Sequence, residues 1–392
     1  MSRERPQPPV LPFVAAQPLV DHHCHGVLRG GGDLAELLNE ADGAAAAGGM
    51  AFDTLAGLSF RRWCPPVLGL SAHAPVSAYE ERRAALGGDE VNRRFLGPCG
   101  LAALCVDTGY TPSDLLSAAE TAAFAGAAAF EVVRLEQVAE ALAASGVGAA
   151  EFPDRYRTAL AERVSATASG VSAVAVKSIA AYRVGLDLDG RRPADSEVTG
   201  AVSRWLGAGG EPDGSRPPRL ADQVLHRFFI WCGADLGLPV QFHVGYGDRD
   251  IDLQRCNPLL LTGLLRALEP AGVPVMLLHN YPYHREAGYL AQVFPLVYAD
   301  LGLATHNVGA RSAAVLAEAL ELVPMRKFLF SSDAFGLPEL YYLGTTLFRR
   351  ALSAFLSDRL AADEISYADA ERTTRLIGAE NARRAYQLPA GQ

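Results

Sequence analysis

Eight short apolar segments recur along the chain, and longer stretches with helical patterning separate them. The segments are PLVDHHCH from residue 18, LAALCVD from 101, FEVVRL from 130, VSAVAVKSI from 171, LPVQFHV from 238, VPVMLLH from 273, PLVYADLGL from 295 and KFLFSSD from 327. Apolar runs that alternate with helices are typical of parallel strands joined by helical crossovers. Eight such units predict an α/β protein with a (β/α)₈ TIM-type barrel.

Ionisable side chains lie within or at the ends of most of these predicted strands. They are His23, His25, Asp107, Lys177, His243, His279 and Asp333. In a TIM-type barrel the C-terminal ends of all strands meet at one face, and catalytic residues lie there. A random globular chain is not expected to gather such groups at one end of so many strands. The pattern therefore predicts an active site at this face.

One barrel domain is expected to span residues 1–392, because a chain that is 49% hydrophobic can bury a large core. Two insertions are expected within it. Residues 34–98 carry several helical patterns between the first two strands, and residues 187–220 are polar and rich in glycine and proline. Insertions of this kind usually form lids or subunit contacts, and the helical one favours a homodimer.

The net charge and the N-terminal sequence indicate which class of partner and which location to expect. The formal net charge is −9 and no basic block occurs, which argues against nucleic acid or an anionic membrane as the main partner. The first twenty residues carry charges and prolines where a secretory signal needs an apolar core, so we expect a cytoplasmic protein. Six scattered cysteines predict buried, reduced thiols. A small-molecule substrate is the expected partner.

The stretch VDHHCH places three histidines in four positions of the first predicted strand. Side chains on a strand alternate between faces, so His23 and His25 can reach one metal ion together, while His22 and Cys24 form the competing pair. A catalytic zinc-like site needs about three nitrogen or oxygen ligands and an open position. His243 and Asp333 can complete such a set. His279 is a further candidate, either as the ligand of a second ion or as a proton-transfer residue.

These residues resemble the ligand pattern of the amidohydrolase superfamily. VDHHCH fits its Asp-x-His-x-His opening, single histidines follow on strands five and six, and an aspartate follows on strand eight. GAENARRAYQL resembles the terminal helix of the amidohydrolase-related branch. AVKSIAAYRVGL, QFHVGYGDRDIDLQRCNPLLL and FLFSSDAFGLPELYYLG are similar to the amidohydrolase-like half of proteins fused to a glutamine-synthetase-like domain.

The resemblance implies one or two divalent metal ions, most often zinc, that activate water for attack on an amide or other C–N bond. It selects His23 and His25 as ligands and leaves His22 and Cys24 in the barrel wall. It also implies that Asp333 both ligates the metal and acts as general base, and that His279 steadies the oxyanion. A structural interpretation of Asp333 is a helix N-cap. Non-hydrolytic decarboxylation and a ligand-binding or regulatory barrel without catalysis are the alternative functions.

Lys177 has three interpretations, because a bare ammonium in an apolar run is costly without a partner. By the resemblance, it is carboxylated and bridges two metal ions. Alternatively, it is a cation that binds a substrate carboxylate. The third interpretation is a structural lysine paired with a group such as Asp107.

Three further residues are candidates for substrate binding. Arg183 follows the fourth strand, and its guanidinium can hold a carboxylate through two hydrogen bonds, although a solvated surface arginine is an equal alternative. Tyr182 lies beside it as a hydrogen-bond donor. His306 follows the seventh strand and either lines the pocket or has no role. We therefore expect a small carboxylated substrate.

Overall fold

In the computed structural model, residues 10–41, 50–109, 114–165, 170–209 and 217–389 are described. Within these ranges seven parallel strands form one sheet, and each strand pairs with its neighbour in sequence. The strands are β1 Leu19–Cys24, β2 Leu101–Asp107, β3 Ala128–Arg134, β4 Ser172–Ser178, β5 Val240–Val244, β6 Val275–His279 and β7 Val297–Ala299. All seven coincide with segments that the sequence predicts as strands. The TIM-type fold is therefore confirmed.

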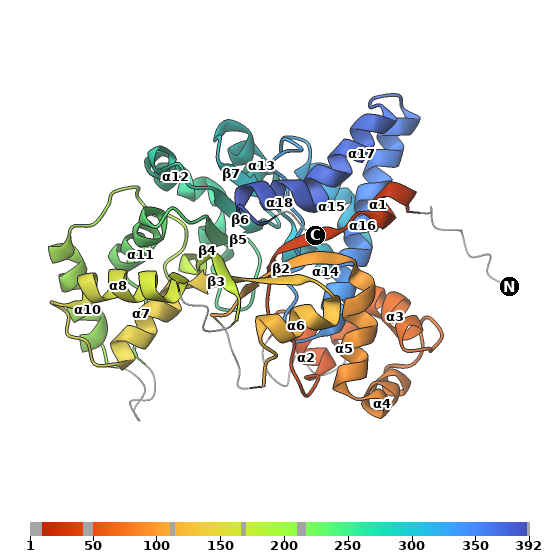
Figure 1. Cartoon of the computed structure of the whole chain (residues 1–392), viewed down its shortest axis with the longest axis horizontal. Helices are drawn as coiled ribbons and strands as arrows, with labels where there is room; N and C mark the ends of the chain where they lie inside the picture. Colours follow the sequence, from red (N-terminus) through yellow and green to blue (C-terminus); the bar gives the residue numbers. More distant parts are fainter. Residues whose placement is uncertain (1–9, 42–49, 110–113, 166–169, 210–216, 390–392) are drawn as a thin grey trace.

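Helices connect the strands and pack around the sheet (Figure 1). The α-helices are α1 Pro12–Ala16, α2 Leu34–Leu37, α3 Leu55–Val67, α4 Val76–Leu86, α5 Gly88–Leu96, α6 Ala118–Ala125, α7 Leu135–Ala144, α8 Phe152–Ser165, α9 Ala180–Arg183, α10 Asp195–Gly207, α11 Gln223–Asp235, α12 Thr262–Leu268, α13 His284–Val293, α14 Gly302–Asn307, α15 Ser312–Ala319, α16 Pro338–Ala361, α17 Tyr367–Arg375 and α18 Asn381–Ala385. Shorter turns are η1 Met50–Asp53, η2 Gly97–Cys99, η3 Leu253–Cys256, η4 Pro258–Leu261, η5 Glu269–Ala271, η6 Gly309–Arg311 and the π-turn η7 Leu376–Glu380.

Residues 327–333, predicted as the eighth strand, form no regular strand but connect β7 to β1. On one side the amide of Ala299 donates a hydrogen bond to the carbonyl of Lys327 at 3.0 Å. On the other side the amide of Asp333 donates to the carbonyl of His23, also at 3.0 Å. Asp333 has a φ of 50°, which lies in the left-handed region and interrupts the extended backbone. The irregular segment thus sets Asp333 beside the end of β1.

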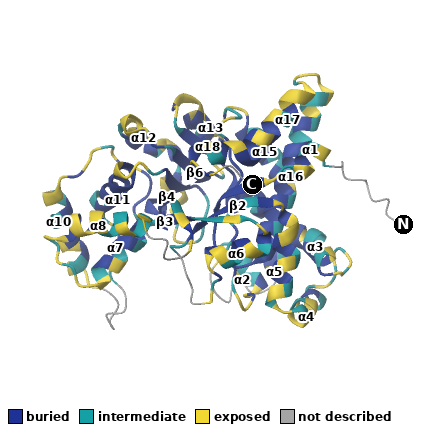
Figure 2. Cartoon of the chain, viewed as in Figure 1, coloured by how far each residue is buried: buried dark blue, intermediate teal, exposed yellow. Residues whose placement is uncertain are grey.

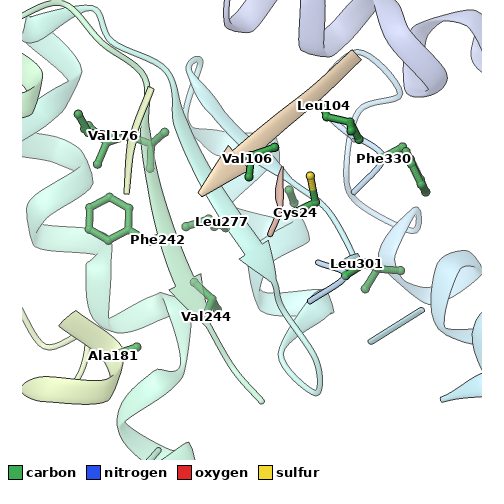
Figure 3. Close-up of a cluster of buried hydrophobic side chains, with 14 of the residues drawn as sticks. Cys24, Leu104, Val106, Val176, Ala181, Phe242, Val244, Leu277, Leu301 and Phe330 are labelled. Carbon is green, nitrogen blue, oxygen red and sulfur yellow. The ribbon is translucent and has the colours of Figure 1, made fainter. Parts of the chain in front are cut away.

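Two apolar clusters, one on each face of the sheet, form the core. Strands buried on both faces read as continuous apolar runs, which explains the runs in the sequence. Figure 3 shows part of the first cluster, where alternate residues of the strands, such as Leu104 and Val106 of β2 and Phe242 of β5, point to the same side. In the second cluster their neighbours, such as Cys105, pack against Tyr386, which follows α18. In Figure 2 much of the sheet is dark blue, and most exposed residues lie on the outer helices and loops.

The insertions predicted from the sequence both contain helices. Residues 34–98 hold α2 to α5, and the fully buried carboxylate of Glu339 on α16 anchors α4. It accepts hydrogen bonds from Tyr79 Oη at 2.8 Å and from Arg83 Nε at 2.7 Å. The stretch 187–220, predicted only as polar, contains α10 among its described residues.

Two further findings concern the cysteines and membrane-spanning helices. All six cysteines are buried and none forms a disulfide, as predicted. Among the helices that the structure describes, none is both long enough and apolar enough to cross a membrane.

Candidate active site

Three imidazoles converge on the carboxylate of Asp333 at the C-terminal end of the sheet. His23 Nε2 and His25 Nε2 lie 3.1 and 3.3 Å from Asp333 Oδ1, and His279 Nδ1 lies 3.5 Å from Oδ2. The side chain of Asp333 is 10% exposed, while those of His23 and His279 are almost fully buried. The structure therefore brings together four of the residues that the sequence predicts for the site. Asp333 is not an N-cap, because α16 begins after Leu337.

Irregular backbone conformations orient the side chains of the histidines on β1 and of His279. The pairing of β1 with β2 shifts register between Asp21 and Cys24, so simple alternation fails at the histidines. His279 ends β6 with a φ of 69°, a left-handed conformation that non-glycine residues seldom adopt. Such conformations persist where surrounding contacts hold them, and they gather at functional sites.

The prediction that His22 lies in the barrel wall with Cys24 is wrong. His22 Nε2 lies 2.6 Å from Asp300 Oδ2, and His22 Nδ1 lies 2.8 Å from the hydroxyl of Tyr386. The amide of Gln241 donates to the same hydroxyl at 2.8 Å. Cys24 instead belongs to the first apolar cluster. His22 is thus part of a buried polar network beneath the site, and the register shift in β1 is what separates it from Cys24.

Asp300 is the centre of this network and was not among the predicted site residues. Its Oδ1 accepts hydrogen bonds from the amides of His279 at 2.6 Å and Gly302 at 3.2 Å. Its Oδ2 accepts one from Ser331 Oγ at 2.9 Å and contacts His22. Asp300 lies within the seventh predicted segment and directly follows β7, so the rule that found the other residues could have found it as well.

Replacing Asp300 with alanine is expected to lower the free energy of unfolding by about 3 kcal/mol or more, because several buried donors lose their acceptor. Asp300→Asn keeps one carbonyl acceptor and is expected to cost less. Urea unfolding of the metal-free proteins measures both. Equal stability of Asp300→Ala and the wild type would show that the network contributes nothing to folding.

Lys177 bridges two groups of the site. Its Nζ lies 2.9 Å from His23 Nε2 and 3.3 Å from Asp107 Oδ2. Arg134 Nη2 donates to the same Asp107 oxygen at 2.7 Å. Burial alone would raise the pKa of Asp107, but the charges of Arg134 and Lys177 hold it well below its usual range. Arg134, the last residue of β3, is a second residue that the sequence analysis missed.

A cavity of about 620 Å³ opens above these residues, which is a size typical of small-molecule sites. His25, Lys177, His243, His279 and Asp333 line it, and so do all three predicted substrate-binding residues, Tyr182, Arg183 and His306. Acidic residues on its lining include Glu36, Glu40, Asp248 and Asp250.

The three predicted substrate-binding residues differ in their contacts. The ring of Tyr182 packs on His243 with 4.5 Å between centroids. Arg183 Nη2 lies 3.6 Å from Glu140 Oε1, so its guanidinium is partly engaged. His306 is buried on α14, and burial lowers its pKa to about 4.

Burial keeps the imidazoles of His23, His243 and His279 neutral. It lowers the pKa of His23 to about 4 and that of His243 to about 3, in both cases helped by the charge of Lys177. It also lowers the pKa of His279 well below the usual value. For Asp333, burial alone would raise the pKa, but the imidazoles of His279 and His23 hold it well below its usual range. Neutral imidazole and ionised carboxylate are the forms that bind metal ions.

The metal-free protein is expected to lose stability as the pH falls from about 6.5 towards 4. Below pH 6.5 the unfolded chain protonates His23 and His243, whereas the folded protein does not until about pH 4 and about pH 3, so unfolding takes up protons. Urea unfolding at pH 7.5 and 5 measures the loss. His243→Gln is expected to reduce this pH dependence, and the exposed His73→Gln to leave it unchanged. An identical dependence in all three proteins would contradict the assignment.

The residues present fit a divalent metal ion. His23, His279 and Asp333 form one group whose ligand atoms all lie within 4.8 Å of one another, and His23, His25 and Asp107 form another. His279 is buried, yet neither of its ring nitrogens has a hydrogen-bond partner among the described residues. A buried imidazole without a partner is costly, and a cation would satisfy it. His243 belongs to neither group, and its Nε2 lies 3.0 Å from the carbonyl oxygen of Tyr246.

The sequence and fold match known proteins along most of the chain. The sequence model of the amidohydrolase family matches residues 127–388. The chain belongs to the amidohydrolase family. The structure of this amidohydrolase is similar to that of a Lactobacillus casei ATCC 334 protein assigned by inference to the metal-dependent hydrolases. The TM-score is 0.79 and the identity 30%, over 96% of this chain and 98% of the other.

One further protein sequence and one further solved structure are similar to this chain, but at lower sequence identity. Protein fluG of Emericella nidulans is 28% identical over 96% of this amidohydrolase, which spans about half (46%) of the fluG chain. Glucuronate isomerase from Caulobacter crescentus has a TM-score of 0.63 and 14% identity, over 100% of this chain and 97% of the other. At that identity the likeness shows the fold alone.

Proposed function

We propose that this protein is a metal-dependent hydrolase that attacks an amide or other C–N bond of a small carboxylated substrate with water. One observation carries the proposal: three imidazoles converge on the ionised carboxylate of Asp333 at the base of a 620 Å³ cavity. A purely structural cluster has no need to leave the buried nitrogens of His279 without partners. The relative from Lactobacillus casei is assigned to the same broad class.

One zinc ion is proposed for the group formed by His23, His279 and Asp333, with His25 as an adjacent ligand. The alternative group contains Asp107, whose carboxylate already faces the cations Arg134 and Lys177. A second dication there would be repelled while Lys177 stays an ammonium. In this proposal Lys177 is therefore the cation paired with Asp107, not a carboxylated bridge.

When bound, a divalent ion would supply Lewis acidity that lowers the pKa of water and polarises a substrate carbonyl. The ionised Asp333 would accept the proton that the attacking water loses and pass it to the leaving nitrogen. His279 would steady the oxygen that gains charge as the carbonyl carbon becomes tetrahedral. Because these groups are buried, bulk water is largely excluded and the electrostatic interactions are strong.

In this proposal, residues on the wall of the cavity orient the substrate. Arg183 would bind a substrate carboxylate, for which its Glu140 contact at 3.6 Å is loose enough to give way. Tyr182 keeps its proton because burial raises its pKa well above the usual value, so it would donate a hydrogen bond. His306 on α14 is neutral and buried on the cavity lining, and it would contact the substrate there.

Elemental analysis of purified wild type and Lys177→Ala tests the metal assignment. About one divalent ion per chain is expected in both proteins, because Lys177 is not a ligand in this proposal. About two ions in the wild type, falling in the variant, would instead establish the carboxylated lysine and a binuclear site. His243→Gln is a matched control, since His243 lines the same cavity but belongs to neither ligand group.

Product analysis tests the reaction. The metal-loaded protein is incubated with N-acyl and γ-glutamyl amides and, separately, with aryl carboxylates, while amine and carbon dioxide release are followed. Amine release that chelation abolishes supports the proposal. Carbon dioxide release without amine release would make the protein a decarboxylase. Metal binding without either product across the panel would favour a ligand-binding barrel.

A further inference from the structure

A second cavity, of about 480 Å³, lies between α3 and α16. Its size is within the range of small-molecule sites. It shares no lining residue with the main cavity. Figure 1 shows α3 and α16 on the opposite side of the molecule from α10 and α11. Much of its lining is apolar, including Val10, Leu55, Leu58, Trp63, Leu347 and Ala351.

Two guanidinium groups flank one indole at this cavity. The Cζ of Arg62 on α3 lies 4.6 Å from the ring centroid of Trp63, and the Cζ of Arg350 on α16 lies 5.0 Å from it. Cation–π contacts of this kind stabilise both arginines over the ring. Both positively charged groups therefore lie beside the same ring at the cavity wall.

In the described part of the chain, no carboxylate is paired with either of these arginines. Among the described residues, neither Arg62 nor Arg350 forms an ion pair or hydrogen bond through its side chain. Asp358 also lines the cavity, but it lies eight residues from Arg350 on α16, which is about 12 Å along the helix axis. Another guanidinium stacked on a tryptophan differs, since Arg192, with its Cζ 4.4 Å from the ring centroid of Trp231, is bonded to Asp235 at 2.6 Å.

The charge pair carries an energetic cost that an anion would remove. Burial and the neighbouring charge of Arg62 lower the pKa of Arg350. A carboxylate between the two guanidiniums would accept charge-assisted hydrogen bonds from both. Leu55 and Leu58 on the same helix are 42% and 48% exposed, so apolar surface continues beside the charges. The cavity thus offers a cationic end and an apolar end.

We propose that the α3–α16 cavity binds an amphipathic monocarboxylate, a small acid with an apolar acyl or aryl body. Its carboxylate lies between Arg62 and Arg350, and its body packs against Leu55, Leu58 and Leu347. This binding site is separate from the proposed active site, and its existence does not depend on the proposed hydrolysis.

Titration with octanoate and, separately, 1-octanol tests the proposal by calorimetry and by tryptophan fluorescence, to which Trp63 contributes. Saturable octanoate binding is expected, weaker by at least about tenfold in Arg62→Gln/Arg350→Gln. Octanol lacks the charge and is expected to bind weakly and equally to both proteins. Arg192→Gln is the matched control, because it removes the other guanidinium stacked on a tryptophan, and it is expected to keep full octanoate affinity.

Three results would overturn the proposal. The first is octanoate binding that the double substitution leaves unchanged, and the second is no saturation below about 10 mM. The third is a dimer by sedimentation that excludes octanoate and that the double substitution dissociates, since the cavity would then be an interface between two copies. If the glutamine variant fails to fold by thermal melting, Arg62→Lys/Arg350→Lys replaces it. Loss of the planar donors is then expected to weaken binding while charge is kept.

Discussion

Replacing Asp333 with asparagine is expected to lower kcat by about 10²–10⁴-fold, the range for loss of a general acid–base group. Asparagine is similar in size but cannot accept the proton that the attacking water must lose. It also removes the negative charge that faces His23, His25 and His279, so weaker metal binding is expected as well. The measurement is amine release from an N-acyl substrate of the wild type, with the metal content determined on the same samples.

The control for this prediction is Asp250→Asn. Asp250 lines the same cavity, but its carboxylate is bonded to Arg219 at 3.0 Å and lies outside the predicted ligand groups. This variant is expected to keep its metal and most of its kcat. If Asp333→Asn retained at least half of the wild-type kcat with a full complement of metal, another group would have to take the proton.

Arg134→Met is expected to lower the free energy of unfolding by about 3 kcal/mol, because it removes one partner of a buried ion pair. Asp107 is buried, and Arg134 and Lys177 are the cations that hold its charge. Methionine fills much of the volume of arginine, so the loss reports the charge rather than a cavity. Chemical unfolding in urea, followed by circular dichroism, measures the change.

Two further variants check the origin of this loss. Arg191→Met removes an exposed arginine that is bonded to Glu197 through both guanidinium nitrogens, and no measurable loss of stability is expected. Asp107→Asn combined with Arg134→Met is expected to recover part of the stability, because the stranded charge is gone. Full additivity of the two substitutions would indicate that they do not interact.

The positions of the strands could be predicted from the sequence because the signal is local. Each buried strand is an apolar run of its own. The predicted runs at 101 and 171 contain β2 and β4, and the run at 130 covers all of β3 except its first two residues. The eighth segment is the exception. Residues 327–333 contain a short apolar run and bond to β7 and β1, but they form no regular strand, and the left-handed Asp333 ends their extended backbone.

The candidate site was found only in part, for a related reason. Position at a strand end is a local property, and it pointed to His23, His25, His279 and Asp333. Position at a strand end did not show which other residues these side chains contact. Asp300 lies within a predicted strand too, but a carboxylate that holds a backbone amide cannot be told from a ligand until its neighbours are known.

The sequence by itself determined the fold class, the strand positions and the end of the sheet at which ionisable groups gather, because periodicity and strand order are properties of neighbouring residues. Only the tertiary structure decided which way each histidine faces. His22 meets Asp300 from 278 positions away, and a register shift within β1 separates it from Cys24. The pairing of Lys177 with Asp107 and the arginine pair over Trp63 were likewise decided there. Contacts between residues far apart in the chain depend on packing that no local pattern encodes.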